Sequence, residues 1–442
     1  MSEKLIGIVT KILEICKEIP LCDRCLGRIF SAYGAGLSNK LRGLSIKTII
    51  TMIMPYIVKE LDVEEVKKIA ENMKFPPVLE VLRRMNIHVE YVEKPCYICS
   101  DLLDRIIEEY TRKILKESLN YEFENFLIGV HVPSEIIFKE ENILREFRIE
   151  TYESIKNEIK REVGKRIKEK LNIEPEFQEP DIVFLINLVE NKLDVDIKPL
   201  FIAGRYLKLG RRISQIKWLI WNGMKYRLKY DLSIEECLQE IAEVFKAEKA
   251  VLHAAGREDV DVRMLGYGRP MIVELRKPRL RKILEGRLRA AQSKVSEVSK
   301  GYVLAFFEKK VSRNLVREIK EQAKNHVKTY RALVLSESMI RNNDLKRIEN
   351  IFSNILISQR TPTRVLRRRP DVLREKIVYK VATRKICENV FEAIIRCQGG
   401  LYVKELVNGD QGRTSPSFSS VIGKNLKCLE LDVLSISTSI QG

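Results

Sequence analysis

Hydrophobic residues follow a helical spacing at the start of the chain and again after residue 150. One amphipathic helix is indicated by the apolar positions Leu5, Ile8, Val9, Ile12, Leu13 and Cys16, which alternate with charged residues. A second helix is indicated by residues that recur every four positions in a strongly charged segment, namely Ile155, Ile159, Val163, Ile167 and Leu171. The second helix falls in a region whose pattern changes, from about residue 101, to that of an α/β unit.

Short apolar runs predict strands in the middle and last parts of the chain. Residues 126–130 and 182–189 are nearly continuous in apolar side chains, as buried strands are. Residues 193–197 alternate apolar and polar positions, which favours a strand with one buried face. Further strands are predicted at 271–275 and 303–307. The periodicity shows only that helices and strands are mixed along the chain.

The length of 442 residues exceeds one ordinary core and predicts two or three domains. We expect a helical region with paired cysteines over 1–100, an α/β domain over 101–208 and a larger domain over 209–442. Ser233 and Glu236 form a capping-box pattern that predicts a helix start near the beginning of the larger domain.

The chain is strongly basic, with 79 Lys and Arg against 61 Asp and Glu and a net charge of +18. An excess of that size indicates a polyanionic partner, most commonly a nucleic acid. The longest apolar stretch, Ile49 to Val58, contains Pro55 and is shorter than the roughly 20 residues of a membrane span. Since no signal peptide is recognised either, we expect a soluble, cytoplasmic protein without a membrane partner.

Two of the cysteine pairs have the spacing of metal knuckles: Cys22-x-x-Cys25 and Cys96-x-x-Cys99. Four thiolates would close a tetrahedral site for structural Zn²⁺ and leave no position open for catalytic water. The 70 residues between the pairs exceed the usual ribbon spacing, so two unrelated buried pairs or a redox pair are the alternatives. The other five cysteines, at 16, 237, 387, 397 and 428, are scattered in apolar patterns typical of a core.

The segment 253–270 combines glycines, arginines and carboxylates in a pattern that indicates chemistry. Arg257, Arg263 and Arg269 offer planar donor forks that suit phosphate oxygens. Glu258, Asp259 and Asp261 lie among them, and neighbouring cations keep a carboxylate ionised as a nucleophile or base. The alternative is an ordinary charged surface loop, rich in glycine because it turns.

Gly256-Arg257-x-Asp259 resembles the catalytic loop of pseudouridine synthases. The longer string resembles the archaeal and eukaryotic tRNA pseudouridine synthases that have an N-terminal zinc and THUMP region and act on uridines 54 and 55 of the tRNA T-loop. Further similar segments are Cys25 to Arg28, Thr361 to Pro370, Lys328 to Val334 and Gly399 to Leu406. The resemblance implies an α+β protein with a THUMP domain over 101–208 and, over 209–442, a mixed, mainly antiparallel sheet flanked by helices.

The same resemblance implies roles for individual residues. Asp259 is expected to attack the ribose at C1′ or to remove a sugar proton, and Asp261 is the alternative carboxylate. Arg257 would fill the space left by a flipped-out nucleotide, which must leave its stack to react. Tyr330 would stack on the uracil and assist proton loss at C5.

Lys404 would pair with the catalytic aspartate, and Leu401 would pack beneath the base. Because many relatives have an arginine where this chain has Lys404, Arg413 is the alternative partner of the aspartate. Arg263 and Arg269 complete the expected substrate-binding set. The basic run 276–289 is expected to contact the tRNA backbone, with a solvated face as the alternative, and a second arginine cluster at 364–374 begins in the segment that matches the family's pattern. Arg205 with Tyr206 could hold a phosphate and stack a base, with a solvated linker as the alternative.

The sequence thus predicts a monomeric tRNA pseudouridine synthase with a structural zinc ion and no catalytic or nucleotide cofactor. A noncatalytic, zinc-containing RNA-binding protein is one alternative, because the basic charge and the paired cysteines fit such a protein as well as they fit an enzyme. Another THUMP-bearing enzyme, a methyltransferase or thiouridine synthase, would need a glycine-rich nucleotide turn or phosphate loop. Gly266-x-Gly268 is followed by Arg-Pro and does not open a helix, so it matches neither the nucleotide turn nor the phosphate loop.

Overall fold

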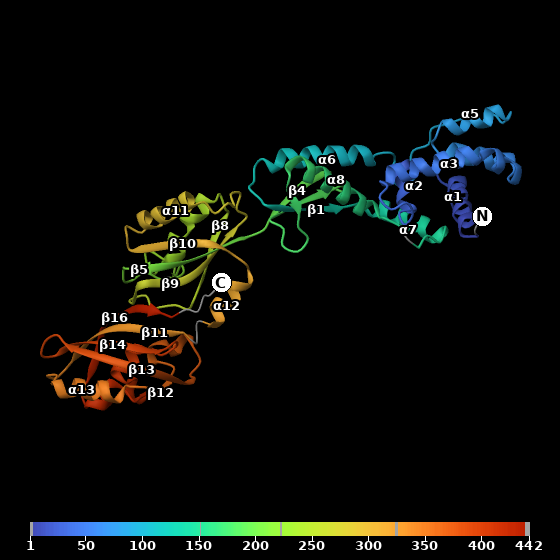
Figure 1. The fold of residues 1–442 in the computed structure, drawn as a ribbon. Helices are drawn as coiled ribbons and strands as arrows, with labels where there is room; N and C mark the ends of the chain where they lie inside the picture. Colours follow the sequence, from blue (N-terminus) through green and yellow to red (C-terminus); the bar gives the residue numbers. More distant parts are fainter. Residues whose placement is uncertain (1–2, 151, 222, 323–325, 438–442) are drawn as a thin grey trace. The chain divides into compact units, whose positions relative to one another are not determined.

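The computed structural model describes residues 3–150, 152–221, 223–322 and 326–437. The chain forms two compact units, Met1–Ile197 and Lys198–Gly442, each of which is described by itself (Figure 1).

The first unit begins with a group of helices. They are α1 (Glu3–Glu18), α2 (Asp23–Ile29), α3 (Asn39–Glu60), α4 (Val63–Asn72) and α5 (Pro77–Arg84). Helices α2 and α3 touch backbone to backbone at two glycines. A Cβ on Gly27 would lie 1.8 Å from the Asn39 carbonyl oxygen, and one on Gly43 would lie 1.9 Å from that of Asp23. Only glycine permits this close approach, which fixes the helix that bears the first cysteine pair.

Helix α3 is the one described helix long and apolar enough to cross a membrane by length and composition. The same composition is found in core helices, and one face of α3 belongs to the core of the first unit through Ile50, Met54 and Ile57. Its buried Lys47 forms an ion pair with Asp23 at 2.8 Å.

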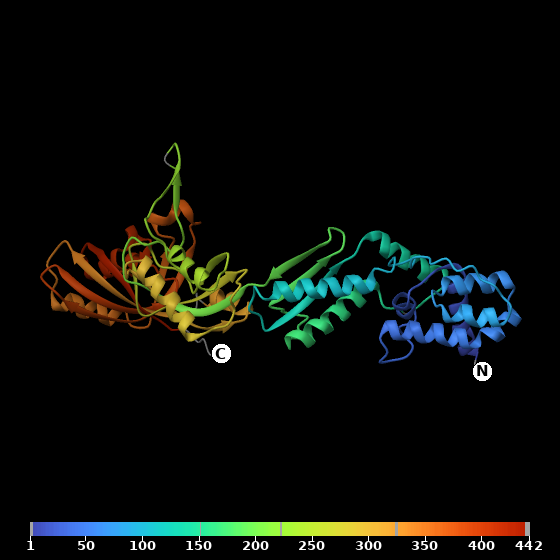
Figure 2. The ribbon, with the colours of Figure 1, turned by 90° about the horizontal axis from the view of Figure 1, so that it is seen from above.

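The rest of the first unit is an α/β layer. Its elements are α6 (Leu103–Ser118), β1 (Asn125–His131), α7 (Ser134–Glu146), α8 (Ile155–Leu171), β2 (Glu174–Pro175), β3 (Ile182–Asn187) and β4 (Lys192–Ile197). The strand order is β2-β1-β3-β4, in which β1 is parallel to β2 and β3 while β4 is antiparallel to β3. Helices α6 and α8 contact each other and cover the sheet (Figures 1 and 2). The strands and the amphipathic helix expected here are confirmed.

The second unit contains a large mixed sheet. Its strands are β5 (Leu200–Lys208), β8 (Lys249–Ala254), β9 (Arg263–Arg276), β10 (Val303–Val311), β11 (Val327–Ser336), β12 (Ile355–Arg360), β13 (Leu373–Lys385), β14 (Val390–Gln398), β15 (Thr414–Ser415) and β16 (Leu426–Ile436). The order is β10-β5-β9-β16-β11-β14-β13-β12-β15, with β8 paired to β9. Among the described strand pairs of this sheet, β9–β16 alone is parallel, which confirms the expected mixed, mainly antiparallel sheet.

Helices and turns flank this sheet. They are α9 (Ile234–Cys237), α10 (Gln239–Val244), α11 (Glu285–Val298), α12 (Asn314–Gln322), α13 (Asn342–Ile351), α14 (Val403–Asn408), α15 (Phe418–Ile422) and the 3₁₀ turns η1 (Thr363–Arg368) and η2 (Asp410–Gly412). The Ser233 hydroxyl accepts the Glu236 amide at 3.2 Å, as its capping pattern predicts. A separate hairpin of β6 (Leu219–Trp221) and β7 (Tyr226–Leu228) projects away from the sheet (Figure 2).

Two boundaries differ from those expected from sequence. The first unit ends at residue 197, not 208, because the apolar run at 200–208 is an interior strand between β9 and β10. The segment 253–270 is a loop only in its middle, because β9 begins at Arg263. Gly266 and Gly268 have positive φ and lie where a Cβ would be 1.9 Å and 2.7 Å from the carbonyl oxygens of Leu434 and Tyr206. These two glycines therefore serve close strand contacts and not a ligand.

Candidate active site

A cavity of about 770 Å³ opens in the second unit where the loop between β8 and β9 meets β11, η1 and the turn before α14. Its size is in the range of pockets that hold one small ligand. Predicted residues that line it are Arg257, Asp259, Arg269, Tyr330, Leu401 and Lys404. Arg263 and Arg413 are not among the lining residues. The structure therefore brings together side chains that are up to 147 positions apart in sequence.

Asp259 presents its carboxylate to this cavity with 43% of the side chain exposed. Arg364 Nη1 lies 2.8 Å from Asp259 Oδ2, and Lys404 Nζ lies 3.7 Å from the same oxygen. A reacting carboxylate needs this combination of access and neighbouring cations.

Asp261 has a different environment. Lys404 Nζ donates to its two carboxylate oxygens at 2.8 and 2.6 Å, and the side chain is 63% exposed. Burial raises the pKa of Asp261, but the hydrogen bond and charge of Lys404 outweigh burial and lower it overall. Asp261 does not line the cavity. Of the two candidate carboxylates, Asp259 is the one that lines the cavity, while Asp261 binds the lysine.

The backbone of the catalytic loop is fixed by buried donors from β5, β9 and the segment after β5. Lys208 Nζ donates to the carbonyls of Asp259 at 3.0 Å and Val260 at 3.3 Å. Arg269 Nη1 donates to the carbonyl of Ala255 at 2.7 Å, and Gln215 Nε2 donates to that of Gly256 at 3.0 Å. Carbonyls on both sides of Asp259 are thus tied to the sheet, which holds the carboxylate in place.

Glu258 is the acceptor at the centre of these donors. Arg269 Nε donates to it at 2.8 Å, and the Tyr206 hydroxyl lies 3.2 and 3.1 Å from its two oxygens. Burial raises the pKa of Glu258, but the charges of Arg269 and Lys208 outweigh burial and lower it overall. Glu258 is therefore a buried, ionised carboxylate that fixes the loop to the sheet beneath it. Tyr206 is fully buried, so the base-stacking role expected for it is wrong.

Tyr330 and Leu401 both contribute to the cavity wall. Tyr330 lies on β11, and Leu401 is in the turn between β14 and α14. Burial raises the pKa of the Tyr330 phenol, so this hydroxyl stays protonated near neutral pH. An aromatic ring and an apolar side chain in one cavity with Asp259 suit a flat base held between them.

Three of the arginines expected to bind substrate are occupied within the protein. Arg269 is buried against Glu258. Arg263 makes a two-pronged ion pair with Asp432, at 2.8 Å from Nε and 2.7 Å from Nη2. Arg413 binds the Thr361 carbonyl at 2.9 Å and the Asp371 carboxylate, so it is not the partner of Asp259. Of the expected binding arginines, Arg257 alone lines the cavity without an ion pair to any carboxylate in the described part of the chain.

Arg364 is the site residue that sequence reasoning did not single out. It lies in η1, and its Nε also contacts Glu405 Oε1 at 2.6 Å on α14. The available signal was the Thr361 to Pro370 segment, which resembles the family's pattern but contains several arginines and does not single out one of them. Other cations that line the cavity are Lys320, Lys328, Arg369, Arg374 and Lys376. The other basic run, 276–289, is not part of the lining, and its Arg281 is buried.

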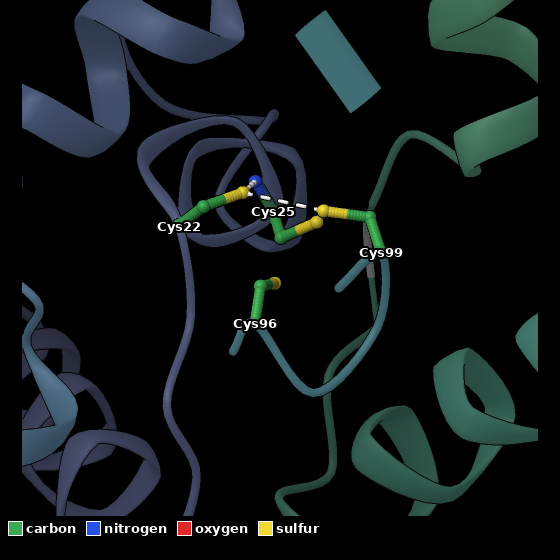
Figure 3. A group of neighbouring side chains, drawn as sticks. All are labelled: Cys22, Cys25, Cys96 and Cys99. Carbon is green, nitrogen blue, oxygen red and sulfur yellow. Dashed lines mark hydrogen bonds between the residues drawn. The ribbon is translucent and has the colours of Figure 1, made fainter. Parts of the chain in front are cut away.

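The two cysteine pairs come together in the first unit. The sulfur atoms of Cys22, Cys25, Cys96 and Cys99 all lie within 4.8 Å of one another, and those of Cys22 and Cys99 are 3.6 Å apart (Figure 3). Arg28 Nη2 lies 3.4 Å from the Cys25 sulfur and also pairs with buried Glu140 and Glu158. Four clustered sulfurs beside a guanidinium fit a thiolate-bound metal, and the 70-residue gap is closed by the intervening helices.

A mixed sheet whose loop presents Asp259 beside Tyr330, Leu401 and a cation has the arrangement expected of a pseudouridine synthase. Family models match in two places: the C-terminal region of Pus10 over residues 201–437 and the archaeal Pus10 THUMP domain over 110–187. The chain belongs to the Pus10 family of tRNA pseudouridine synthases.

Relatives cover almost the whole chain. The tRNA pseudouridine synthase Pus10 of Ignisphaera aggregans is 40% identical over 95% of this chain and 97% of its own length. That of Methanocaldococcus jannaschii is 38% identical over 96% of this chain and 93% of its own. Among solved structures, a Cbf5-Nop10-Gar1 complex is 18% identical and covers 46% of this chain and 44% of its own, with a TM-score of 0.28. That last likeness is too slight to support an argument.

Proposed function

We propose that this protein converts uridine to pseudouridine in the T-loop of tRNA, at positions 54 and 55, with Asp259 as the reacting carboxylate. The observation that carries the proposal is the placement of Asp259 in one cavity with Tyr330, Leu401 and Arg364. Membership of the Pus10 family supports it independently.

The reaction breaks the bond between N1 and C1′, turns the uracil and joins C5 to C1′. In our proposal Asp259 attacks C1′ or removes a sugar proton, and Arg364 holds it in position. Tyr330 and Leu401 keep the detached base between them while it turns. The atoms of substrate and product are the same, so the isomerisation consumes no co-substrate.

The rim of the cavity suits the RNA backbone. Arg257, Arg369 and Lys376 carry positive charge around the opening, and phosphate contacts of this kind supply most nonspecific affinity for RNA. The cavity admits a nucleotide only after it leaves its stack, and Arg257 would take its place there.

The four clustered cysteines are proposed to hold a structural Zn²⁺. Cys22, Cys25, Cys96 and Cys99 supply four soft ligands, and a closed tetrathiolate site contributes to folding and not to catalysis. That the enzyme is monomeric and cytoplasmic stays a prediction from the sequence.

The proposed activity is tested on unmodified tRNA transcripts. The purified protein is incubated with three transcripts: wild type, one with cytidine at position 54 and one with cytidine at position 55. Pseudouridine mapped at both positions of the wild-type transcript, and at the remaining uridine of each variant, is the expected result. Absence of pseudouridine from all three transcripts would refute the proposal. Modification at only one position would restrict the proposed activity to that uridine.

A further inference from the structure

Lys328 is a buried amine in the catalytic cavity that no described group binds. It lies on β11 two residues before Tyr330, and both side chains line the cavity. The residue is 7% exposed. Within the described part of the chain, its Nζ makes no hydrogen bond or ion pair. An ammonium group in such a position has lost most of its water without gaining an acceptor, which is costly. Its Nζ is not among the fully enclosed unpaired atoms, so the amine keeps access to the cavity.

Lys208 shows what a structural lysine looks like in the same unit. It is buried more deeply, at 1% exposed, and its Nζ donates to three carbonyls, those of Ile213, Asp259 and Val260. The comparison indicates that Lys328 is kept without acceptors for a reason other than packing. Because the unpaired amine borders an open cavity, a substrate bound in that cavity could supply its hydrogen-bond partner.

The surroundings of Lys328 lower its pKa and so increase the fraction of neutral amine. Burial lowers the pKa of Lys328, and the nearby charge of Arg269 lowers it further, to about 8. Glu258 acts in the opposite direction but is already bound by Arg269. Opposite Lys328 on β14 lies Cys397, a thiol whose pKa burial raises to about 12, and on β16 lies Ile436. His326, just before β11, is buried and has no hydrogen-bond partner for either ring nitrogen.

The reaction needs a proton acceptor. When C5 of the turned uracil has joined C1′, it still carries its hydrogen, whereas pseudouridine has no hydrogen at C5 and one at N1. Tyr330 is a poor acceptor, because burial holds its hydroxyl in the protonated form. A base is most effective when its pKa lies near the working pH.

We propose that Lys328 Nζ, as a neutral amine, removes the C5 proton from the rejoined uracil and returns a proton to N1. The C5–H bond breaks, its electron pair forms the C5=C6 double bond, and the C6=N1 pair moves onto N1, which takes up the proton. No net proton is gained or lost, and no oxidant or co-reactant is required. This inference rests on the proposed pseudouridine synthase activity.

The test uses the full-length enzyme under single-turnover conditions with saturating tRNA. Transcripts carry either ordinary uridine or 5-deuterouridine, and rates are measured over a pH range that spans 8. The variants are Lys328→Met, which removes the amine, and Lys328→Arg, which keeps the positive charge but cannot act as a base. Lys380→Met is the control, because Lys380 is exposed on β13 and is not part of the cavity lining.

We expect both Lys328 variants to lose about 100-fold or more in rate, the usual contribution of a positioned acid or base. They should bind tRNA within about 2-fold of wild type and show a larger 5-deuterium isotope effect. The wild-type rate should rise with pH through about 8, and the residual rate of Lys328→Met should lack that rise. Lys328→Ala should regain activity when methylamine is added.

Two results would overturn the inference. One is a Lys328→Met enzyme with the wild-type rate and pH profile. The other is a rate loss matched by weaker tRNA binding, with no isotope effect and no amine rescue, which would make Lys328 a binding contact. If the wild-type enzyme forms no pseudouridine, the proposed function itself fails, and this outcome is distinguishable because the control and wild type are then equally inactive.

Discussion

Arg364 Nη1 lies 2.8 Å from Asp259 Oδ2, while its Nε lies 2.6 Å from Glu405 Oε1. One guanidinium therefore joins the catalytic loop to α14 across 146 residues of sequence. Its two prongs bind two different carboxylates, which a single ammonium group cannot do with the same geometry.

Substitution of Arg364 by Met should lower the rate at saturating tRNA by about 10- to 100-fold, because Asp259 loses its direct partner. Arg364→Lys should restore only part of the rate, since the bond to Glu405 or that to Asp259 must be given up. Single-turnover rates check this, with Arg347→Met, an exposed position on α13, as the control. Wild-type rates in Arg364→Met would exclude the positioning role.

The two candidate carboxylates are separated by matched alanine variants. Asp259→Ala should abolish pseudouridine formation and leave tRNA binding within about 3-fold of wild type. The reason is that the carboxylate takes part in the chemical step and contributes little to the affinity for tRNA. Asp261→Ala should retain measurable turnover, since that carboxylate binds Lys404 but does not itself line the cavity. Loss of turnover in Asp261→Ala alone would assign the reaction to the other carboxylate.

Glu258→Ala should destabilise the second unit by about 3–5 kcal/mol, because it leaves buried Arg269 without its carboxylate. Denaturant unfolding measures the loss. Glu308→Ala is the matched control, since it removes an exposed ion pair with Arg205 and should cost less than about 1 kcal/mol. Equal effects of the two substitutions would contradict the buried role of Glu258.

Asp432 gives a pH-dependent contribution to stability. Burial raises the pKa of Asp432, but Arg263 and Arg211 outweigh burial and lower it overall. Because the folded-state pKa lies below the unfolded value of about 3.9, the stabilisation is present above that pH and is lost as pH falls through the folded-state pKa. Asp432→Asn should therefore be less stable than wild type at pH 7, and the difference should shrink below about pH 4. Unfolding curves of both proteins from neutral to acid pH would reveal a constant difference if this is wrong.

Metal analysis tests the cysteine cluster. We expect about one zinc per chain, and we expect Cys25→Ser or a strong chelator to lower the melting temperature of the first unit. Cys387→Ser is the control, because that thiol is exposed and outside the cluster. A metal content unchanged in Cys25→Ser would place the ion elsewhere.

The sequence was sufficient for the parts of the site that lie in local motifs. Asp259, Tyr330 and Leu401 were predicted from short segments, and the structure places them in one cavity. The helix at 155–171 and the strands of the first unit followed from periodicity, because each buries one regular face.

Pairings between distant charges could not be predicted in the same way. Arg364 is one of several arginines in its segment, and nothing local indicates that it alone reaches Asp259. Arg269 was expected to bind phosphate because of its guanidinium group. A charge pattern does not show which side chains are buried, and in the structure this guanidinium binds Glu258. Lys404 was correctly placed beside the loop, yet it bonds mainly to Asp261.

Strand β5 has a practical consequence for dissecting the protein. It follows the last strand of the THUMP-containing unit after two residues, and it is hydrogen-bonded on both edges, to β9 and β10. A polypeptide cut at residue 209 would lack this inner strand and Lys208, leaving two sheet edges unpaired and the carbonyls of the catalytic loop without their donor. Separate expression of the catalytic half should therefore start at about residue 198.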